Sequence, residues 1–154
     1  MSKGTDGPDG MVGSVAIKRT ESQDMSSYFI TLANLPKFEQ TAGLETMILT
    51  GLNGEKMMMV LNSTLPGCTV PMHSHPHEQI GMVYSGRALL RIGNNEREVS
   101  KGDFYCIPSG IQHGDTCIGD EAFVMLDIFY PVRQDFIDKM KKSIDVNSAL
   151  SASN

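Results

Sequence analysis

The chain has 154 residues, a mass of 16.8 kDa, a formal net charge of −5 and a pI of about 5.3. This length predicts one domain with a hydrophobic core. The mildly acidic balance argues against nucleic acid or an anionic membrane as a partner, and no apolar run reaches the length of a membrane span. The N-terminal segment lacks the apolar stretch of a signal peptide, so we expect a cytoplasmic protein.

Short apolar runs separated by turn residues dominate the chain. Residues 1–27 are rich in Gly, Ser and Asp and predict a partly disordered tail. Within its short apolar patch, Val12 to Ile17, the segment Val15 to Ile17 could pair with a sheet edge. Beyond this tail we expect strands at 29–32, 44–50, 56–64, 80–84, 87–92, 96–99, 104–107 and 122–130, with turns at 51–54 and 93–95. Many short strands and almost no helical period indicate an all-β sandwich or barrel.

Helical spacing occurs near the C-terminal end. In 132–142, after Pro131, apolar residues recur at i, i+4, i+5 and i+8, which predicts one face of a short amphipathic helix. The small, polar segment 146–154 predicts a frayed end. We therefore expect a tail over 1–27, a single domain over 28–145 and a frayed C-terminus over 146–154.

Three of the four histidines lie close together, at His73, His75 and His77. Alternate residues of a strand project to the same face, so these side chains begin as neighbours. Imidazole is the commonest protein ligand for transition metals, and two imidazoles on one face form half a site. Because Pro76 interrupts the strand ladder, we expect His77 at the rim of the site and not on the metal.

The surrounding sequence resembles the two motifs of the cupin family. The first motif, G-x5-H-x-H-x3,4-E-x6-G, is matched by Gly67, His73, His75 and Gly86, with Gln79 in place of the Glu. The second motif, G-x5-P-x-G-x2-H-x3-N, is matched by Gly102, Pro108, Gly110 and His113, with Cys117 in place of the Asn. The resemblance spans about residues 44–131 and implies the cupin double-stranded β-helix, which is a jelly-roll barrel.

This resemblance implies one divalent transition metal per chain, held by His73, His75, Gln79 and His113. Three imidazoles and one oxygen suit Zn, Ni, Mn, Fe or Co. Glu78 is the alternative oxygen ligand, although the motif spacing favours Gln79. Because Gln79 is neutral, the ion would keep its full charge, which favours a Lewis acid over an oxygen-activating centre.

The last predicted strand carries one carboxylate, Asp127, inside an apolar run. Burying an unpaired carboxylate is costly, so Asp127 must face a polar cavity, a metal or a cation. Phe129 shares its face, and Arg133 follows just beyond. One hypothesis makes Asp127 a general acid or base and Arg133 a fork for a substrate carboxylate. The alternative is a structural ion pair between Asp127 and Arg133.

A closer resemblance favours the first hypothesis. The segments HSHPHEQ at 73–79 and LDIFYPVRQDF at 126–136 are similar to small cupins of the pectin-degradation KdgF type, which convert ring-form 4,5-unsaturated uronates to the linear keto sugar. For this chain the resemblance implies a metal-dependent, non-redox ring opening of such a sugar acid. It also implies catalytic roles for Asp127 and Arg133, and substrate contacts from Phe129 and Arg133.

Two other classes of function fit the same residues. One is a cupin dioxygenase, or a polyketide cyclase-like enzyme with the same three-His, one-Gln set. The other is a non-catalytic cupin that binds a metal or a sugar. Cupins are commonly dimers, so we expect a homodimer with a small-molecule substrate and without a nucleic-acid or membrane partner.

Overall fold

The structure, a computed structural model, describes residues 29–50 and 56–151, with only the backbone described for 146–151. The predicted tail over 1–27, including Val12 to Ile17, and the predicted turn at 51–54 lie outside these residues. The described strands are β1 (Lys37–Thr41), β2 (Leu44–Thr50), β3 (Met58–Thr64), β4 (Thr69–His73), β5 (Glu78–Ser85), β6 (Arg87–Ile92), β7 (Asn95–Ser100), β8 (Phe104–Ile107), β9 (His113–Cys117) and β10 (Phe123–Tyr130). They are preceded by a 3-10 turn, Leu32–Asn34, and followed by helix α1, Gln134–Ser151.

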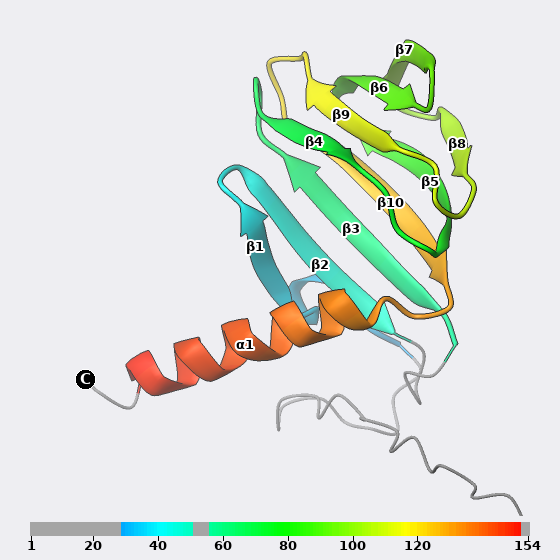
Figure 1. Cartoon of the computed structure of the whole chain (residues 1–154). Helices are drawn as coiled ribbons and strands as arrows, with labels where there is room; N and C mark the ends of the chain where they lie inside the picture. The colour runs from blue at the N-terminus through cyan, green and yellow to red at the C-terminus, as the bar shows by residue number, and fades with distance from the viewer. Residues whose placement is uncertain (1–28, 51–55, 152–154) are drawn as a thin grey trace, which may run out of the picture.

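The strands form two antiparallel sheets (Figure 1). One sheet has the order β1-β2-β3-β10-β5-β8, and the other has the order β4-β9-β6-β7. From β3 onward the chain passes repeatedly from one sheet to the other, so that strands distant in sequence become neighbours. This topology confirms the predicted all-β cupin fold, a double-stranded β-helix or jelly roll.

Alternation along the strands separates an inner face from an outer one. In β10 every second residue from Phe123 to Phe129 is buried, and β3 alternates in the same way. One core cluster lies between the sheets and includes Val83, Leu90, Val99 and Phe123. Burying each such side chain contributes about 1.5–3 kcal/mol to stability.

Helix α1 completes a second core cluster. Phe136, Ile137 and Met140 pack against inner-face residues of the six-stranded sheet, among them Ile48 and Met58. The helix thus covers the part of this face beside β1 and β2 that the smaller sheet does not reach (Figure 1).

The predicted helix over 132–142 exists but is longer than expected. The backbone stays helical to Ser151. The helix therefore continues into the segment 146–154, which was expected to be frayed. The division into a tail, a domain and an end stays a prediction. No helix in the described ranges is long and apolar enough to cross a bilayer.

The prediction of a strand at 29–32 is wrong. Hydrogen bonds from Asn34 N to Thr31 O and from Leu35 N to Leu32 O close a turn there instead. Strand β1 was missed because Phe38 is its one buried apolar residue. The hairpin between β6 and β7 is confirmed, and Gly93, with a φ of +57°, takes the left-handed conformation that this turn requires.

Candidate metal centre

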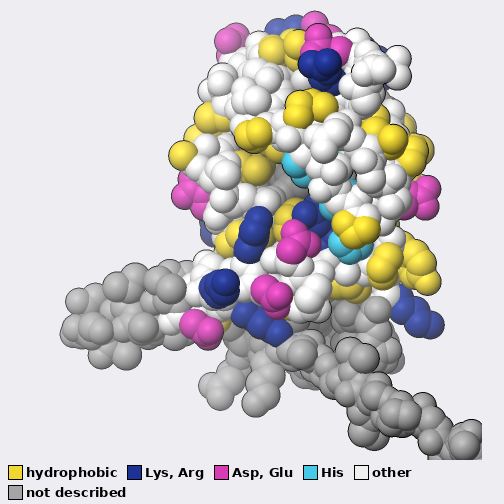
Figure 2. All heavy atoms as spheres, in the orientation of Figure 1, with side chains coloured by type: hydrophobic (Ala, Val, Ile, Leu, Met, Phe, Trp, Pro, Cys, Tyr) yellow, Lys and Arg dark blue, Asp and Glu magenta, His cyan; other side chains and the backbone are white. Residues whose placement is uncertain are grey.

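The three motif histidines come together from three segments. His73 ends β4, His75 lies in the loop before β5, and His113 begins β9 directly opposite His73. One ring nitrogen of each lies within 4.8 Å of those of the other two. In Figure 2 histidine side chains border a hollow above α1. The strand pairing therefore assembles the three imidazoles that the sequence predicted as ligands.

Each of these imidazoles is oriented by a main-chain carbonyl. Nδ1 of His73 lies 2.9 Å from Pro71 O, and Nδ1 of His113 lies 2.8 Å from Ile111 O. Nδ1 of His75 lies 3.0 Å from His77 O. A nitrogen facing a carbonyl carries the proton, so Nε2 keeps its lone pair. Three Nε2 atoms oriented in this way could bind one metal ion, and the hydrogen bonds that would orient such ligands are already made.

Gln79 adds an amide oxygen to the cluster. Its Oε1 lies 3.1 Å from His75 Nε2, while its Nε2 donates to Asp127 Oδ1 over 2.6 Å. Because the carboxylate of Asp127 accepts from the amide NH2, the amide oxygen is left facing His75. Glu78, the alternative ligand, is exposed on the opposite face of β5.

The donor set fits a divalent transition metal. His75 faces an oxygen acceptor at each ring nitrogen, but a neutral imidazole carries one proton. Burial, the charge of Arg133 and the nearby His113 lower the pKa of His75 to about 4, so the ring is neutral at pH 7. The contact between His75 Nε2 and Gln79 Oε1 therefore joins two lone-pair atoms. A cation that both atoms coordinate would remove this conflict.

Asp127 lies beneath Gln79 and is completely buried. It accepts hydrogen bonds from Tyr105 Oη at 2.5 Å, from Gln79 Nε2 at 2.6 Å and from Asn62 Nδ2 at 3.0 Å. Burial raises the pKa of Asp127, and the three hydrogen bonds oppose that rise. Gly81 makes room for this arrangement, because a Cβ there would lie 2.4 Å from Tyr105 Oη and 2.5 Å from Asp127 Oδ1.

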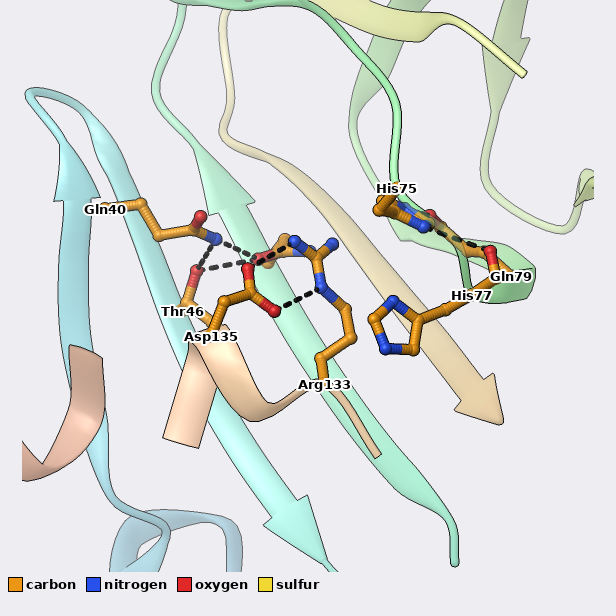
Figure 3. A network of polar contacts seen from close by, with 8 residues as sticks. Gln40, Thr46, His75, His77, Gln79, Arg133 and Asp135 are labelled. Carbon is orange, nitrogen blue, oxygen red and sulfur yellow. Dashed lines mark hydrogen bonds and ion pairs between the residues drawn. The ribbon is translucent and has the colours of Figure 1, made fainter. Parts of the chain in front are cut away.

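Arg133 pairs with Asp135, a carboxylate that sequence analysis did not consider. Its Nε and Nη2 donate to Asp135 over 3.2 and 2.7 Å (Figure 3), so the alternative of an Asp127–Arg133 ion pair is wrong. Its guanidinium carbon lies 3.8 Å from the ring centroid of Phe136 and 5.2 Å from that of Phe129. Asp135 thus binds the Nε and Nη2 edge of the guanidinium, while Nη1 has no hydrogen bond to the described residues.

The ring of Phe129 contacts both the guanidinium of Arg133 and the histidine cluster. Its ring centroid lies 5.4 Å from that of His75, in a perpendicular arrangement. Because the side chain of Phe129 is buried in the core, it restricts the positions of both His75 and Arg133. His77 lies beside Arg133 at the rim of the site (Figure 3).

Three polar residues of the site were missed by sequence analysis. They are Asn62 on β3, Tyr105 on β8 and Asp115 on β9, all buried. Burial and the proximity of Asp127 raise the pKa of Asp115 to about 7. Its position was available as a signal, because Asp115 follows His113 by two residues and shares its face. Asn62 and Tyr105 had no comparable signal, since their partner Asp127 is distant in sequence.

The comparisons with known proteins agree with this geometry. Residues 62–129 match the model of the cupin domain. The pectin degradation protein KdgF of Dickeya dadantii (strain 3937) is 31% identical over 114 residues, which cover 73% of this chain and all of that protein.

Two solved structures share the fold. An RmlC-like cupin from Shewanella frigidimarina superposes with a TM-score of 0.64 at 23% identity, covering 72% of this chain and 96% of that one. KdgF from Halomonas sp. gives a TM-score of 0.63 at 24% identity, covering 70% and 98%. The chain therefore belongs to the cupin family. Within that family it is a small cupin of the KdgF type.

Proposed function

We propose that this chain is a cytoplasmic, metal-dependent, non-redox enzyme that opens the ring of a 4,5-unsaturated uronate or a similar small sugar acid. The observation that carries the proposal is a neutral donor set, His73, His75, His113 and Gln79, placed directly against a buried carboxyl group, Asp127. Support comes also from the similarity to KdgF, whose name assigns it to pectin degradation.

The chemistry needs a Lewis acid and a group that exchanges protons. A divalent ion at this site would polarise a substrate oxygen, and no change in oxidation state is required. Ring opening removes the proton of the anomeric hydroxyl and breaks the bond between C1 and the ring oxygen. A proton is then placed on C4 of the resulting enolate, which gives the keto sugar. The protein must therefore accept one proton and supply another.

Tyr105 and Asp127 can exchange this proton together. Tyr105 lines the cavity beside the histidines, and its hydroxyl donates to Asp127 Oδ1. If the Tyr105 oxygen accepts the substrate proton, its own proton passes to Asp127, and the reverse transfer returns it. Asp127 acts here through Tyr105, since its carboxylate is enclosed by Tyr105, Gln79 and Asn62.

Arg133 is the proposed contact for the sugar carboxylate. Asp135 fixes the Nε and Nη2 edge, and stacking on Phe136 and Phe129 fixes the guanidinium plane. The remaining Nη1 group can donate to a carboxylate without displacing Asp135.

Proton NMR of 4,5-unsaturated galacturonate would test the proposal. The protein is reloaded separately with Zn, Ni, Mn and Fe(II), and the alkene signal is followed over time. We expect faster loss of this signal than with a His113→Ala control. No acceleration with any metal, at confirmed metal occupancy, would contradict the uronate assignment. Oxygen uptake with an aromatic substrate would then support a dioxygenase.

We also propose a homodimer formed through the outer face of the six-stranded sheet. Ile80, Tyr84, Phe104 and Tyr130 expose large apolar side chains there, between 47% and 69% of each. On β3, β10, β5 and β8 the described outward residues are nearly all uncharged, with Glu78 the exception. A face of this composition suits a second copy of itself, because few like charges would oppose each other.

Light scattering after gel filtration would test this dimer. Ile128 points outward from the centre of this face, so Ile128→Lys should give a monomer. Leu89→Lys, on the outer face of the other sheet, is the matched control and should leave the dimer intact. A monomeric wild type would contradict the proposal.

A further inference from the structure

A small chamber lies between the two sheets, beside the histidine cluster. Its volume is about 40 Å³, and the polar residues that line it are Asn62, His73, Gln79, Tyr105, His113 and Asp115. A space of this size holds on the order of two or three water molecules. It is too small for a sugar ring but large enough for a single hydroxyl group.

Asp115, which lines this chamber, has an unsatisfied oxygen. The residue is 6% exposed, and its Oδ1 is fully buried with no hydrogen-bond partner among the described residues. Its neighbours across β9 are Val70 on β4 and Leu90 on β6, which are apolar. A buried carboxyl oxygen without a donor is unfavourable, so we expect a small rearrangement to bring a donor from the adjoining chamber to Oδ1.

The protein donors around the chamber are directed elsewhere. The hydroxyl of Tyr105 and the side-chain amides of Gln79 and Asn62 all donate to Asp127. The donor for Asp115 must therefore come from a molecule that enters the chamber. Water and the hydroxyl of a bound ligand are the two sources that fit this volume.

We propose that Asp115 Oδ1 forms an inner subsite that receives one hydroxyl group of the substrate, displacing a water molecule bound there otherwise. This inference rests on the proposed function, because the ligand is taken to be a small hydroxylated sugar acid. The carboxylate of that ligand then lies toward Arg133, outside the cluster, and one hydroxyl reaches inward past the metal ligands. Asp115 determines specificity by requiring a hydroxyl that points inward, because a site with an unpaired polar group discriminates against ligands that lack the matching one.

The first test is a crystal structure of the zinc-loaded protein, alone and soaked with D-galacturonate. Without sugar we expect a water molecule at hydrogen-bond distance from Asp115 Oδ1. With sugar we expect a hydroxyl in its place. A protein donor at Oδ1, or a water that stays when the sugar is bound, would overturn the inference.

The second test is kinetic, with 4,5-unsaturated galacturonate. Asp115→Ala removes the acceptor and should raise KM by about 10-fold or more, corresponding to one lost hydrogen bond. Asp115→Asn keeps an oxygen in place and should fall between Asp115→Ala and the wild type. Both variants should bind one zinc ion per chain, since Asp115 is not a ligand. An active Asp115→Ala variant with KM within twofold of the wild type would contradict the subsite.

The two proposals fail in different ways. If the wild type converts no unsaturated uronate, the proposed function fails, and the inner subsite is judged by the crystal structure of the zinc-loaded protein. If the wild type converts it and Asp115→Ala does so equally well, the subsite alone fails.

Discussion

Gln79 donates its amide hydrogen to Asp127 Oδ1 over 2.6 Å and turns its oxygen toward His75 Nε2, 3.1 Å away. A buried carboxyl group on β10 thus decides which atom of a neutral side chain on β5 faces the three imidazoles. The pair joins the candidate metal centre to the candidate acid–base group in one hydrogen-bonded unit. Substitutions on either side are expected to disturb this hydrogen bond.

Asp127→Asn and Tyr105→Phe each interrupt the path that carries a proton through Tyr105 to Asp127. We expect either substitution to lower the turnover of 4,5-unsaturated galacturonate by about 100-fold or more. Metal content should remain at one ion per chain, because the histidines are untouched. Turnover from the NMR time course and metal content from mass spectrometry decide the matter. Full turnover in both variants would rule out the relay.

Gln79→Glu replaces the donor to Asp127 with a second carboxyl group. We expect the metal-free variant to lose about 2–3 kcal/mol of unfolding free energy, because two buried carboxyl groups then meet without a donor. Adding Asp127→Asn restores an amide opposite a carboxylate and should recover at least about 1 kcal/mol. Chemical denaturation of the single and double variants measures this coupling. Additive losses would show that the two side chains are independent.

Gly81→Ala tests the close packing beneath the site. The added Cβ would lie 2.3 Å from Tyr105 Cζ and 2.5 Å from Asp127 Oδ1, so the hydrogen bond between them must break or shift. We expect a loss of about 2–4 kcal/mol in thermal unfolding. Gly119→Ala is the control, since its nearest neighbour is 3.8 Å away, and it should change stability by less than about 0.5 kcal/mol. Equal stability of the two variants would contradict this packing.

The metal-free protein should respond to pH through His75 and Asp115 in opposite directions. The pKa of His75 is lowered to about 4, so the folded state resists protonation and stability is lost as the pH falls from about 6.5 toward 4. The pKa of Asp115 is raised to about 7, so stability is lost as the pH rises from about 4 to 7.

Asp115→Asn isolates the second effect, because asparagine is neutral throughout. We expect the Tm of this variant minus that of the wild type to increase from pH 4 to about pH 7 and to level off above it. Thermal unfolding in the presence of a chelator measures the difference. A difference that does not change with pH would mean that Asp115 titrates normally in the fold.

Sequence analysis predicted those residues of the site that lie within the two cupin motifs. His73, His75 and His113 were recognised from their spacing in the motifs. The strands that carry His73 and His113, β4 and β9, were not among the predicted strands. Asp127 was found because a carboxylate in an apolar strand has to be explained. These signals are local or repeat a known pattern.

The remaining features depend on contacts between distant strands. Tyr105 and Asn62 reach Asp127 from β8 and β3, and nothing in their own segments marks them as its donors. Asp135, in the first turn of α1, was not considered as a partner of Arg133, and only the alternative hypothesis, an ion pair with Asp127, is wrong. Pairings of this kind require the backbone path, which side-chain spacing alone does not provide.

Metal binding by matched histidine variants tests the central claim most directly. The wild type should bind one divalent ion per chain, measured by titration with Zn and by mass spectrometry after gel filtration. His113→Ala should weaken this binding by at least about 10-fold, whereas His77→Ala, at the rim, should bind as the wild type does. A wild type that binds no ion, or equal losses in the two variants, would contradict a centre built on His73, His75, Gln79 and His113.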